Sequence, residues 1–240
     1  MSDAPIQSYR LLRKVLPKSL QPILRGLRKR LSMPSGLPEP YRTVFPYTQA
    51  HPTRQENLLR LAKLIDERKV PGALVECGVL DGGTAAIMAF GCSLREVHLF
   101  DSWEGLPAVT AEDGDAAMWS GQVVGNPKRV VAVMSALGIE LSRLRFHKGW
   151  FADTFPITQI DSIALLHIDG DFYDSVKLSL ERWAPKMAPG GFIQIDDYDS
   201  FAGCTKAVDE FLSDYPELKL QFVERGAKAR FIEIPDTWQL

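Results

Sequence analysis

The chain has 240 residues, 45% hydrophobic and 24% charged, and a formal net charge of -2 at pH 7. This composition is typical of a folded domain with a full-sized core and excludes disordered and fibrous classes. The balanced charge argues against nucleic acid as the main partner, and three widely spaced cysteines fit neither a zinc site nor a redox pair. With no secretory signal and no apolar run near the roughly 20 residues of a spanning helix, we expect a cytoplasmic protein.

Residues 1–32 form a distinct basic segment with a net charge of +7, against -9 for the remainder. Apolar residues recur in it at helical spacing, which predicts a basic amphipathic arm in two pieces. Such an arm can adhere to an anionic membrane surface or an acidic partner. Alternatively, it can pack on the acidic body of the chain or on a second subunit. We assign residues 1–45 to this arm and an irregular linker, and residues 46–240 to one folded domain.

Strand and helix patterns alternate after this linker. A capping-box signature, Thr53 to Glu56, predicts the start of a helix of about four turns. Short apolar runs then predict strands. The predicted strands are 73–76, 97–101, 144–147, 163–169, 192–196, 218–223 and 230–234; the predicted helices are one from residue 83, then 127–137, 173–187 and 205–212. This order predicts an α/β fold with a mostly parallel seven-stranded sheet, an antiparallel C-terminal hairpin and helices on both faces.

The residues after the first two strands indicate a nucleoside site, because ligands of such sheets bind beyond the carboxyl ends of the strands. Gly78 and residues 82–84 make a glycine-rich turn into a helix whose amide groups face the site. The spacing lacks the G-x-G-x-x-G of dinucleotide binders. Asp101 follows Gly78 by 23 residues, near the distance at which an acid reaches ribose hydroxyls. Together these features predict a nucleoside without a diphosphate.

Aspartates gather after the fourth and fifth predicted strands. Asp169 and Asp171 follow the fourth, and Asp196 and Asp197 follow the fifth. If these strands are neighbours, the carboxylates raise each other's pKa unless a cation sits among them. Three carboxylates suit a hard cation, and magnesium is the ion we expect. The alternative, that they cap helices, explains one acid and not a cluster. The four histidines show no ligand spacing and are predicted to be structural, with His167 notable beside the acids.

Gly149, Trp150 and Phe151 leave the third predicted strand. Two aromatic rings at this point can flank a purine. They are equally compatible with ordinary core packing, because aromatic side chains bury large apolar areas wherever they lie.

Six stretches of the chain carry a family resemblance, in the right order over roughly residues 45–235. They are VECGVLDGG (75–83), FDSWEGLP (100–107), KGWFADTFP (148–156), LHIDGDFYDS (166–175), PGGFIQIDDY (189–198) and AVDEF (207–211). The chain resembles the macrocin O-methyltransferases. Leu80-Asp81 departs from the Trp-Arg often seen in the family's glycine loop, and residues 1–32 fall outside the resemblance.

The resemblance implies a class I methyltransferase with a Rossmann-like fold in residues 46–240. Such an enzyme binds S-adenosylmethionine, uses magnesium and methylates a hydroxyl, usually on a sugar of a natural product or glycan. By the family pattern Asp169, Asp196 and Asp197 ligate the metal, and Asp171 is the general base. The residues expected to bind the cofactor are Glu76, Gly78, Gly82, Gly83, Thr84, Asp101, Ser102, Gly149, Trp150 and Phe151.

Two other functions stay open from the sequence. One is a metal-dependent methyltransferase of catechols or other phenols. The other is a non-catalytic nucleotide-binding scaffold subunit joined to a complex by the basic arm, against which the intact acids count, because an unneutralised carboxylate cluster costs stability. We also expect a homo-oligomer, a possible peripheral membrane contact through residues 1–32, and a mobile lid formed by residues 109–126.

Overall fold

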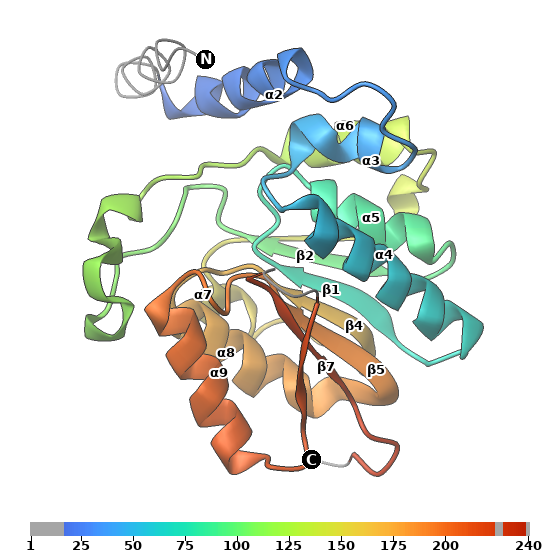
Figure 1. Ribbon diagram of the computed structural model, residues 1–240, viewed down its shortest axis with the longest axis vertical. Helices are drawn as coiled ribbons and strands as arrows, with labels where there is room; N and C mark the ends of the chain where they lie inside the picture. The colour runs from blue at the N-terminus through green and yellow to red at the C-terminus, as the bar shows by residue number, and fades with distance from the viewer. Residues whose placement is uncertain (1–16, 224–227, 239–240) are drawn as a thin grey trace.

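The computed structural model describes residues 17–223 and 228–238, and a seven-stranded sheet forms its centre (Figure 1). The strand order is β3-β2-β1-β4-β5-β7-β6. β1 to β5 run parallel, and β7 is antiparallel to both β5 and β6. This confirms the predicted sheet and its C-terminal hairpin. The strands are β1 Ala73–Cys77, β2 Val97–Asp101, β3 Leu144–Lys148, β4 Ile163–Ile168, β5 Met187–Ile195, β6 Leu220–Phe222 and β7 Arg230–Glu233.

Helices cover both faces of the sheet (Figure 1). One layer consists of α4 Pro52–Glu67, α5 Gly83–Gly91 and α6 Pro127–Ala136, and the other of α7 Phe151–Thr154, α8 Tyr173–Trp183 and α9 Ala202–Asp214. Each layer packs on its own apolar cluster. Every residue of β4 is buried, as expected for a parallel strand covered on both sides.

The order in which strands are added to the sheet reverses at β1, so that β1 and β4 are neighbours. From β1 the chain builds β2 and β3 toward one edge, and then returns to place β4 and β5 on the other side of β1. At such a switch point the loops leaving neighbouring strands diverge and open a crevice beyond their carboxyl ends. The topology therefore brings the loop after β1 next to the loop after β4.

Several predicted element boundaries are wrong. The helix predicted for residues 173–187 ends at Trp183, because Pro185 cannot continue it. A 3-10 turn, η5 Ala184–Lys186, follows, and β5 begins at Met187 rather than at residue 192. At α4 the helix cap is His51, whose Nδ1 accepts the Thr53 amide at 3.4 Å, so the Thr53 capping box does not form.

The linker predicted as irregular contains short helices. α3 Tyr41–Val44 lies within it, and η2 Phe45–Tyr47 begins at its last residue. Val44 is fully buried in the core cluster on the α4 side of the sheet. This part of the linker therefore belongs to the packed body.

The described part of the basic arm is helical. It consists of η1 Lys18–Leu20 and α2 Gln21–Leu31, while residues 1–16 lie outside the described residues. α2 is the outermost layer in Figure 1 and packs against η2. Within residues 17–223 and 228–238, no helix combines the length and apolar character needed to cross a membrane. The remaining elements are η3 Ala111–Trp119 and η4 Leu141–Arg143.

Candidate active site

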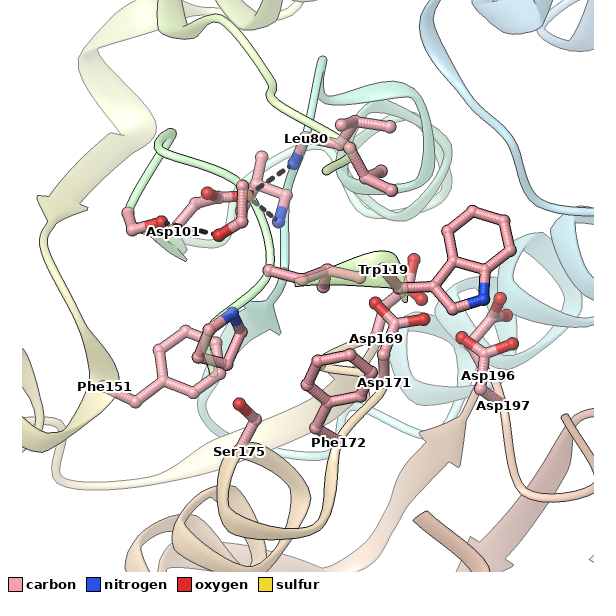
Figure 2. Close-up of a pocket in the computed structure, with 18 of the residues that line it drawn as sticks. Leu80, Asp101, Trp119, Phe151, Asp169, Asp171, Phe172, Ser175, Asp196 and Asp197 are labelled. Atoms are coloured by element: carbon pink, nitrogen blue, oxygen red, sulfur yellow. Dashed lines mark hydrogen bonds between the residues drawn. The ribbon is translucent and has the colours of Figure 1, made fainter. Parts of the chain in front are cut away.

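A cavity of about 450 Å³ lies beyond the carboxyl ends of β1, β2 and β4, at the switch point (Figure 2). Its volume is in the range of small-molecule sites. The structure brings most of the predicted site residues together around it. Those that line it are Gly78, Thr84, Asp101, Ser102, Gly149, Trp150, Phe151, Asp169, Asp171, Asp196 and Asp197. Glu76, Gly82 and Gly83 are not among the residues that line it.

Gly78 lets the ends of β1 and β4 approach closely. Its φ is +98°, and a Cβ atom there would lie 1.9 Å from the carbonyl oxygen of Asp169. Its amide donates to the Phe100 carbonyl at 2.9 Å, and the Asp169 amide donates to the Cys77 carbonyl at 2.8 Å. Any side chain at residue 78 would push the glycine loop away from the aspartates.

Gly82 and Gly83 support the loop from behind. Gly82 caps α5 in the left-handed conformation, and a Cβ atom on it would lie 2.8 Å from Cγ1 of Val130 in α6. A Cβ atom on Gly83 would lie 2.6 Å from Cβ of Thr48, a residue that lines the cavity. In this structure the two glycines permit close packing and do not themselves face the cavity.

Asp101 ties the glycine loop to β2. Its Oδ2 accepts the amides of Val79 at 2.9 Å and Leu80 at 2.7 Å, as Figure 2 shows, and its Oδ1 accepts the Trp103 amide at 2.6 Å. Burial raises the pKa of Asp101, while these three amides lower it. A carboxylate offers about four acceptor positions, so about one remains for a ligand hydroxyl.

The four predicted carboxylates gather at the opposite side of the cavity from Asp101 (Figure 2). One oxygen each of Asp169, Asp171 and Asp197 lies within 4.8 Å of the others. Burial, followed by the charges of Asp196 and Asp197, raises the pKa of Asp169 well above its usual range. Burial and Asp197 do the same to the pKa of Asp171. Burial and the neighbouring acids thus disfavour the charged forms of Asp169 and Asp171, and a cation bound among them would favour the charged forms.

Glu76 and His167 form a fully buried layer beneath these acids. The Nδ1 of His167 lies 2.7 Å from Oε1 of Glu76, and its Nε2 lies 3.5 Å from Oδ1 of Asp196. Burial lowers the pKa of His167, but the nearby carboxylates of Asp196 and Glu76 outweigh it and raise the pKa to about 9. The two acids therefore favour the charged form of His167. Glu76, predicted to bind the cofactor, binds this histidine instead of facing the cavity.

Arg54, which the sequence patterns do not single out, lies against the acids. It stands in the first turn of α4, and its Nη1 contacts Oδ2 of Asp196 and, at 3.3 Å, Oδ1 of Asp197. Burial raises the pKa of Asp196, but His167 and Arg54 outweigh it and lower the pKa below its usual range. No spacing rule links residues 54 and 196, since only the packing of α4 on β5 brings them together.

The donor set fits a divalent cation of the magnesium type. His167 contacts Glu76, and Arg54 contacts Asp196 and one oxygen of Asp197. Oxygens of Asp169, Asp171 and Asp197 lie within 4.8 Å of one another. Carboxylate oxygens grouped in this way are the ligands that hard cations prefer. Oδ1 of Asp196 is buried and lacks a hydrogen-bond partner among the described residues. Asp169 and Asp197 belong to the predicted ligand set, while Asp196 faces Arg54 and His167.

Aromatic side chains line the side of the cavity after β3. Gly149 donates its amide to the Asp101 carbonyl at 3.0 Å, which joins the β3 loop to β2. The ring of Phe151 stacks on Phe155 at 4.8 Å and also lines the cavity beside Trp150, which is 39% exposed. Phe151 thus packs in the core and also lines the cavity. The two predicted environments, a cavity wall and the core, therefore both apply to it.

Asp113, which the sequence patterns also leave unmarked, anchors the segment predicted to be a lid. It is buried; its Oδ1 accepts the Tyr173 amide at the start of α8, and its Oδ2 accepts the Thr110 amide, each at 2.7 Å. Trp119 of the same segment lines the cavity. The segment is therefore fastened to the body at Asp113; its mobility stays a prediction.

Comparison with solved structures identifies the class of protein. The fold is that of class I methyltransferases, shared with the structure of the O-methyltransferase NovP at a TM-score of 0.74 and 26% identity, over 91% of this chain and 100% of that one. The calicheamicin methyltransferase CalS11 matches with a TM-score of 0.66 and 20% identity, over 91% of this chain and 93% of that one, which supports the fold alone.

The family follows from the sequence match. The model of the macrocin O-methyltransferases (TylF) matches residues 37–218, and the chain belongs to this family. A tetracenomycin rhamnosyl 4'-O-methyltransferase of Streptomyces olivaceus is 35% identical over 173 residues, which are 68% of this chain and 66% of that protein. The mycinamicin III 3''-O-methyltransferase of Micromonospora griseorubida is 33% identical over 186 residues, 72% of each chain. The match to the first relative thus spans slightly less than two thirds of its length.

Proposed function

We propose that this protein transfers a methyl group from S-adenosylmethionine to a hydroxyl of a sugar, with magnesium in the carboxylate cluster. The proposal rests on one observation: a glycine loop and a carboxylate cluster line the same cavity. The loop of Gly78 and Asp101 forms one side, and the oxygens of Asp169, Asp171 and Asp197 form the other. Membership of the macrocin O-methyltransferase family, whose relatives act on glycosylated natural products, supports a sugar acceptor.

The cofactor belongs, in this proposal, between the glycine loop and the aromatic wall. Asp101 keeps about one acceptor position for a ribose hydroxyl, because its other positions hold the amides of Val79, Leu80 and Trp103. Phe151 and Trp150 border the place for the adenine. Thr84, in the first turn of α5, lies where helix amides face a ligand. S-adenosylmethionine supplies an electrophilic methyl group on its sulfonium sulfur.

Asp171 is the proposed general base. An alcohol has a pKa far above 7, and each pKa unit corresponds to about 1.36 kcal/mol. The Asp171 carboxylate would accept the hydroxyl proton while the acceptor oxygen takes the methyl group. Asp171 lines the cavity with φ at +58°, which directs the chain sharply after β4. Holding both reactants in one cavity removes much of the entropic cost of their encounter.

The proposed magnesium ligands are Asp169, Asp196 and Asp197. The geometry also offers Asp171 as a third oxygen beside Asp169 and Asp197. A divalent ion held there would lower the pKa of a hydroxyl bound to it. Arg54 would have to share Asp196 and Asp197 with the ion. The predicted homo-oligomeric state and cytoplasmic location stay predictions.

Calorimetry tests the binding part of the proposal. S-adenosylmethionine is titrated into metal-stripped protein, and magnesium is titrated separately into wild type, Asp196→Asn and Asp171→Asn. We expect cofactor binding, and a magnesium site that Asp196→Asn weakens and Asp171→Asn keeps. If Asp171→Asn loses magnesium binding and Asp196→Asn keeps it, Asp171 is a ligand and Asp196 is not. Absence of cofactor binding would overturn the proposal.

Methyl-transfer assays test the acceptor class. Sugar-bearing natural products and small catechols are offered in parallel, and the product is located by mass spectrometry and NMR. Transfer to a sugar hydroxyl supports the proposal. Transfer to the catechol alone would establish the phenolic alternative, since phenols are more acidic and need less from a base.

A further inference from the structure

We infer that the outward face of α2 is a docking surface for an anionic lipid bilayer. Ile23, Leu27 and Leu31 of α2, with Leu20 at the end of η1, form this face and are named here the α2 stripe. Their spacing of three and four residues places them on one side of the helix. They are 42%, 54%, 54% and 83% exposed. The proposal does not depend on the methyltransferase activity, because none of these residues lines the cavity.

A surface helix usually turns its apolar side inward and its charged side outward, but α2 does the opposite. Its inner face carries the small or charged residues Pro22, Arg25, Gly26 and Lys29. Pro22 and Gly26 are buried, and a Cβ atom on Gly26 would meet the guanidinium of Arg129 at 2.3 Å. Polar contacts thus hold α2 on the body and leave its apolar side outward.

The side chains of two residues, Arg25 and Lys29, fix the inner face. Arg25 donates to Oδ2 of the fully buried Asp81 at 2.7 Å and to the Val124 carbonyl at 3.0 Å. The Nζ of Lys29 lies 4.8 Å from the centre of the Phe45 ring. Rotating the helix to bury the α2 stripe would break the contacts of Arg25 and Lys29. These contacts therefore keep the apolar face of α2 exposed to solvent.

Charge identifies a lipid surface as the partner. Residues 17–38 contain five basic residues and no acidic one. At 100° per residue, the exposed Arg28 and Arg30 fall on the two borders of the α2 stripe. Interfacial helices combine such an apolar face with basic borders, which attract anionic headgroups while the apolar side chains enter the bilayer surface. Figure 1 shows α2 as the outermost layer, where a flat surface can reach it.

A second copy of the chain fits this face less well. A stable protein interface buries about 800 Å² on each partner, and four aliphatic side chains on one short helix provide only part of it. Two such helices packed face to face would also bring their arginine side chains close together, and these like charges repel each other.

Co-sedimentation with vesicles tests the inference, using the full-length protein. Vesicles of phosphatidylcholine alone are compared with vesicles containing phosphatidylglycerol, at low and high salt. We expect binding to the anionic vesicles only, weakened several-fold by high salt. The triple variant Ile23→Ser, Leu27→Ser and Leu31→Ser should lose at least about tenfold in affinity, and Arg28→Gln with Arg30→Gln several-fold.

A matched control removes exposed apolar side chains elsewhere. Leu94 and Ile157 are 91% and 81% exposed and lie outside α2, so Leu94→Ser with Ile157→Ser should bind vesicles like wild type. Circular dichroism and thermal unfolding confirm that each variant is folded. The inference is overturned by failure of wild type to bind anionic vesicles, or by equal binding of the triple variant. A dimer that the triple variant abolishes, without vesicle binding, would assign the face to a second copy.

Discussion

Arg25 of α2 pairs with Asp81 of the glycine loop at 2.7 Å, and this contact joins the basic arm to the candidate site. Asp81 is fully buried; it also pairs with Arg129 of α6 at 3.1 Å and accepts the Asn126 amide at 3.1 Å. The neighbouring Leu80 lines the cavity. Arg25 lies outside the family match, which covers residues 37–218, so a segment beyond the matched region contacts the glycine loop.

Removal of this carboxylate should loosen the loop. Asp81→Asn leaves Arg25 and Arg129 without their common counter-charge, so we expect a loss of about 3 kcal/mol in unfolding free energy and weaker binding of S-adenosylmethionine. Denaturant unfolding and calorimetry measure the two effects. Arg30→Gln, on the exposed side of the same helix, is the control and should stay within about 0.5 kcal/mol of wild type. Unchanged cofactor affinity in a destabilised Asp81→Asn would restrict Asp81 to a structural role.

Asp171→Asn should abolish the proton acceptor and keep the shape of the site. We expect turnover to fall by about 10²- to 10⁴-fold while S-adenosylmethionine still binds. Single-turnover methyl transfer and calorimetry on the same preparation separate the two effects. Normal turnover in Asp171→Asn would transfer the role of base to another group.

Arg54 should compete with magnesium for the acids. Because its guanidinium contacts Asp196 and Asp197, replacing it with glutamine removes positive charge from the ligand cluster. We expect Arg54→Gln to bind magnesium several-fold more tightly than wild type in a calorimetric titration. Arg60→Gln is the matched control, since Arg60 lies on the same helix and bonds Asn57 instead. Weaker magnesium binding by Arg54→Gln would show that Arg54 supports the ion site.

The pair of the buried His98 and the half-buried His147 should make stability depend on pH. Nδ1 of His98 lies 3.0 Å from Nε2 of His147. Burial, and then His98, lower the pKa of His147 to about 4, against about 6.5 in an unfolded chain. Between these values the unfolded chain binds more protons, so the contribution is complete above about pH 6.5 and disappears as the pH falls toward 4.

Comparison of wild type with His147→Gln isolates this contribution. Denaturant unfolding at several pH values from 7.5 to 4.5 gives the difference in unfolding free energy between the two proteins. We expect the advantage of wild type to shrink steadily as the pH falls. A constant difference over this range would contradict the assignment.

Gly78→Ala should separate the glycine loop from β4. The new Cβ atom would lie 1.9 Å from the Asp169 carbonyl oxygen, so we expect a loss of about 2–4 kcal/mol in stability and loss of cofactor binding. Gly138→Ala is the control, because Gly138 also has a positive φ, +70°, but no described atom lies within 4 Å of the place that its new methyl group would take. That variant should cost only about 1–2 kcal/mol of backbone strain. Equal losses in both variants would mean that the backbone conformation alone matters.

The sequence by itself determined the order of the strands and helices and the type of sheet. Apolar runs that alternate with helical patterns can be satisfied only by a parallel sheet covered on both faces, because each element must bury its apolar side. The sequence also predicts that Gly78, Asp101 and the aspartates after β4 and β5 lie at the site. They follow strand ends, and strand ends meet at one edge of a parallel sheet.

Only the tertiary structure decided the partners of charged groups far apart in the chain. Arg54 meets Asp196, Arg25 meets Asp81, and Glu76 meets His167, each through the packing of separate elements. Side-chain periodicity predicts which face of an element is buried. It carries no information about which buried charge finds which counter-charge, because that depends on distances of a few ångströms between elements. The outward apolar face of α2 was decided in the same way, by the contact of Arg25 with Asp81.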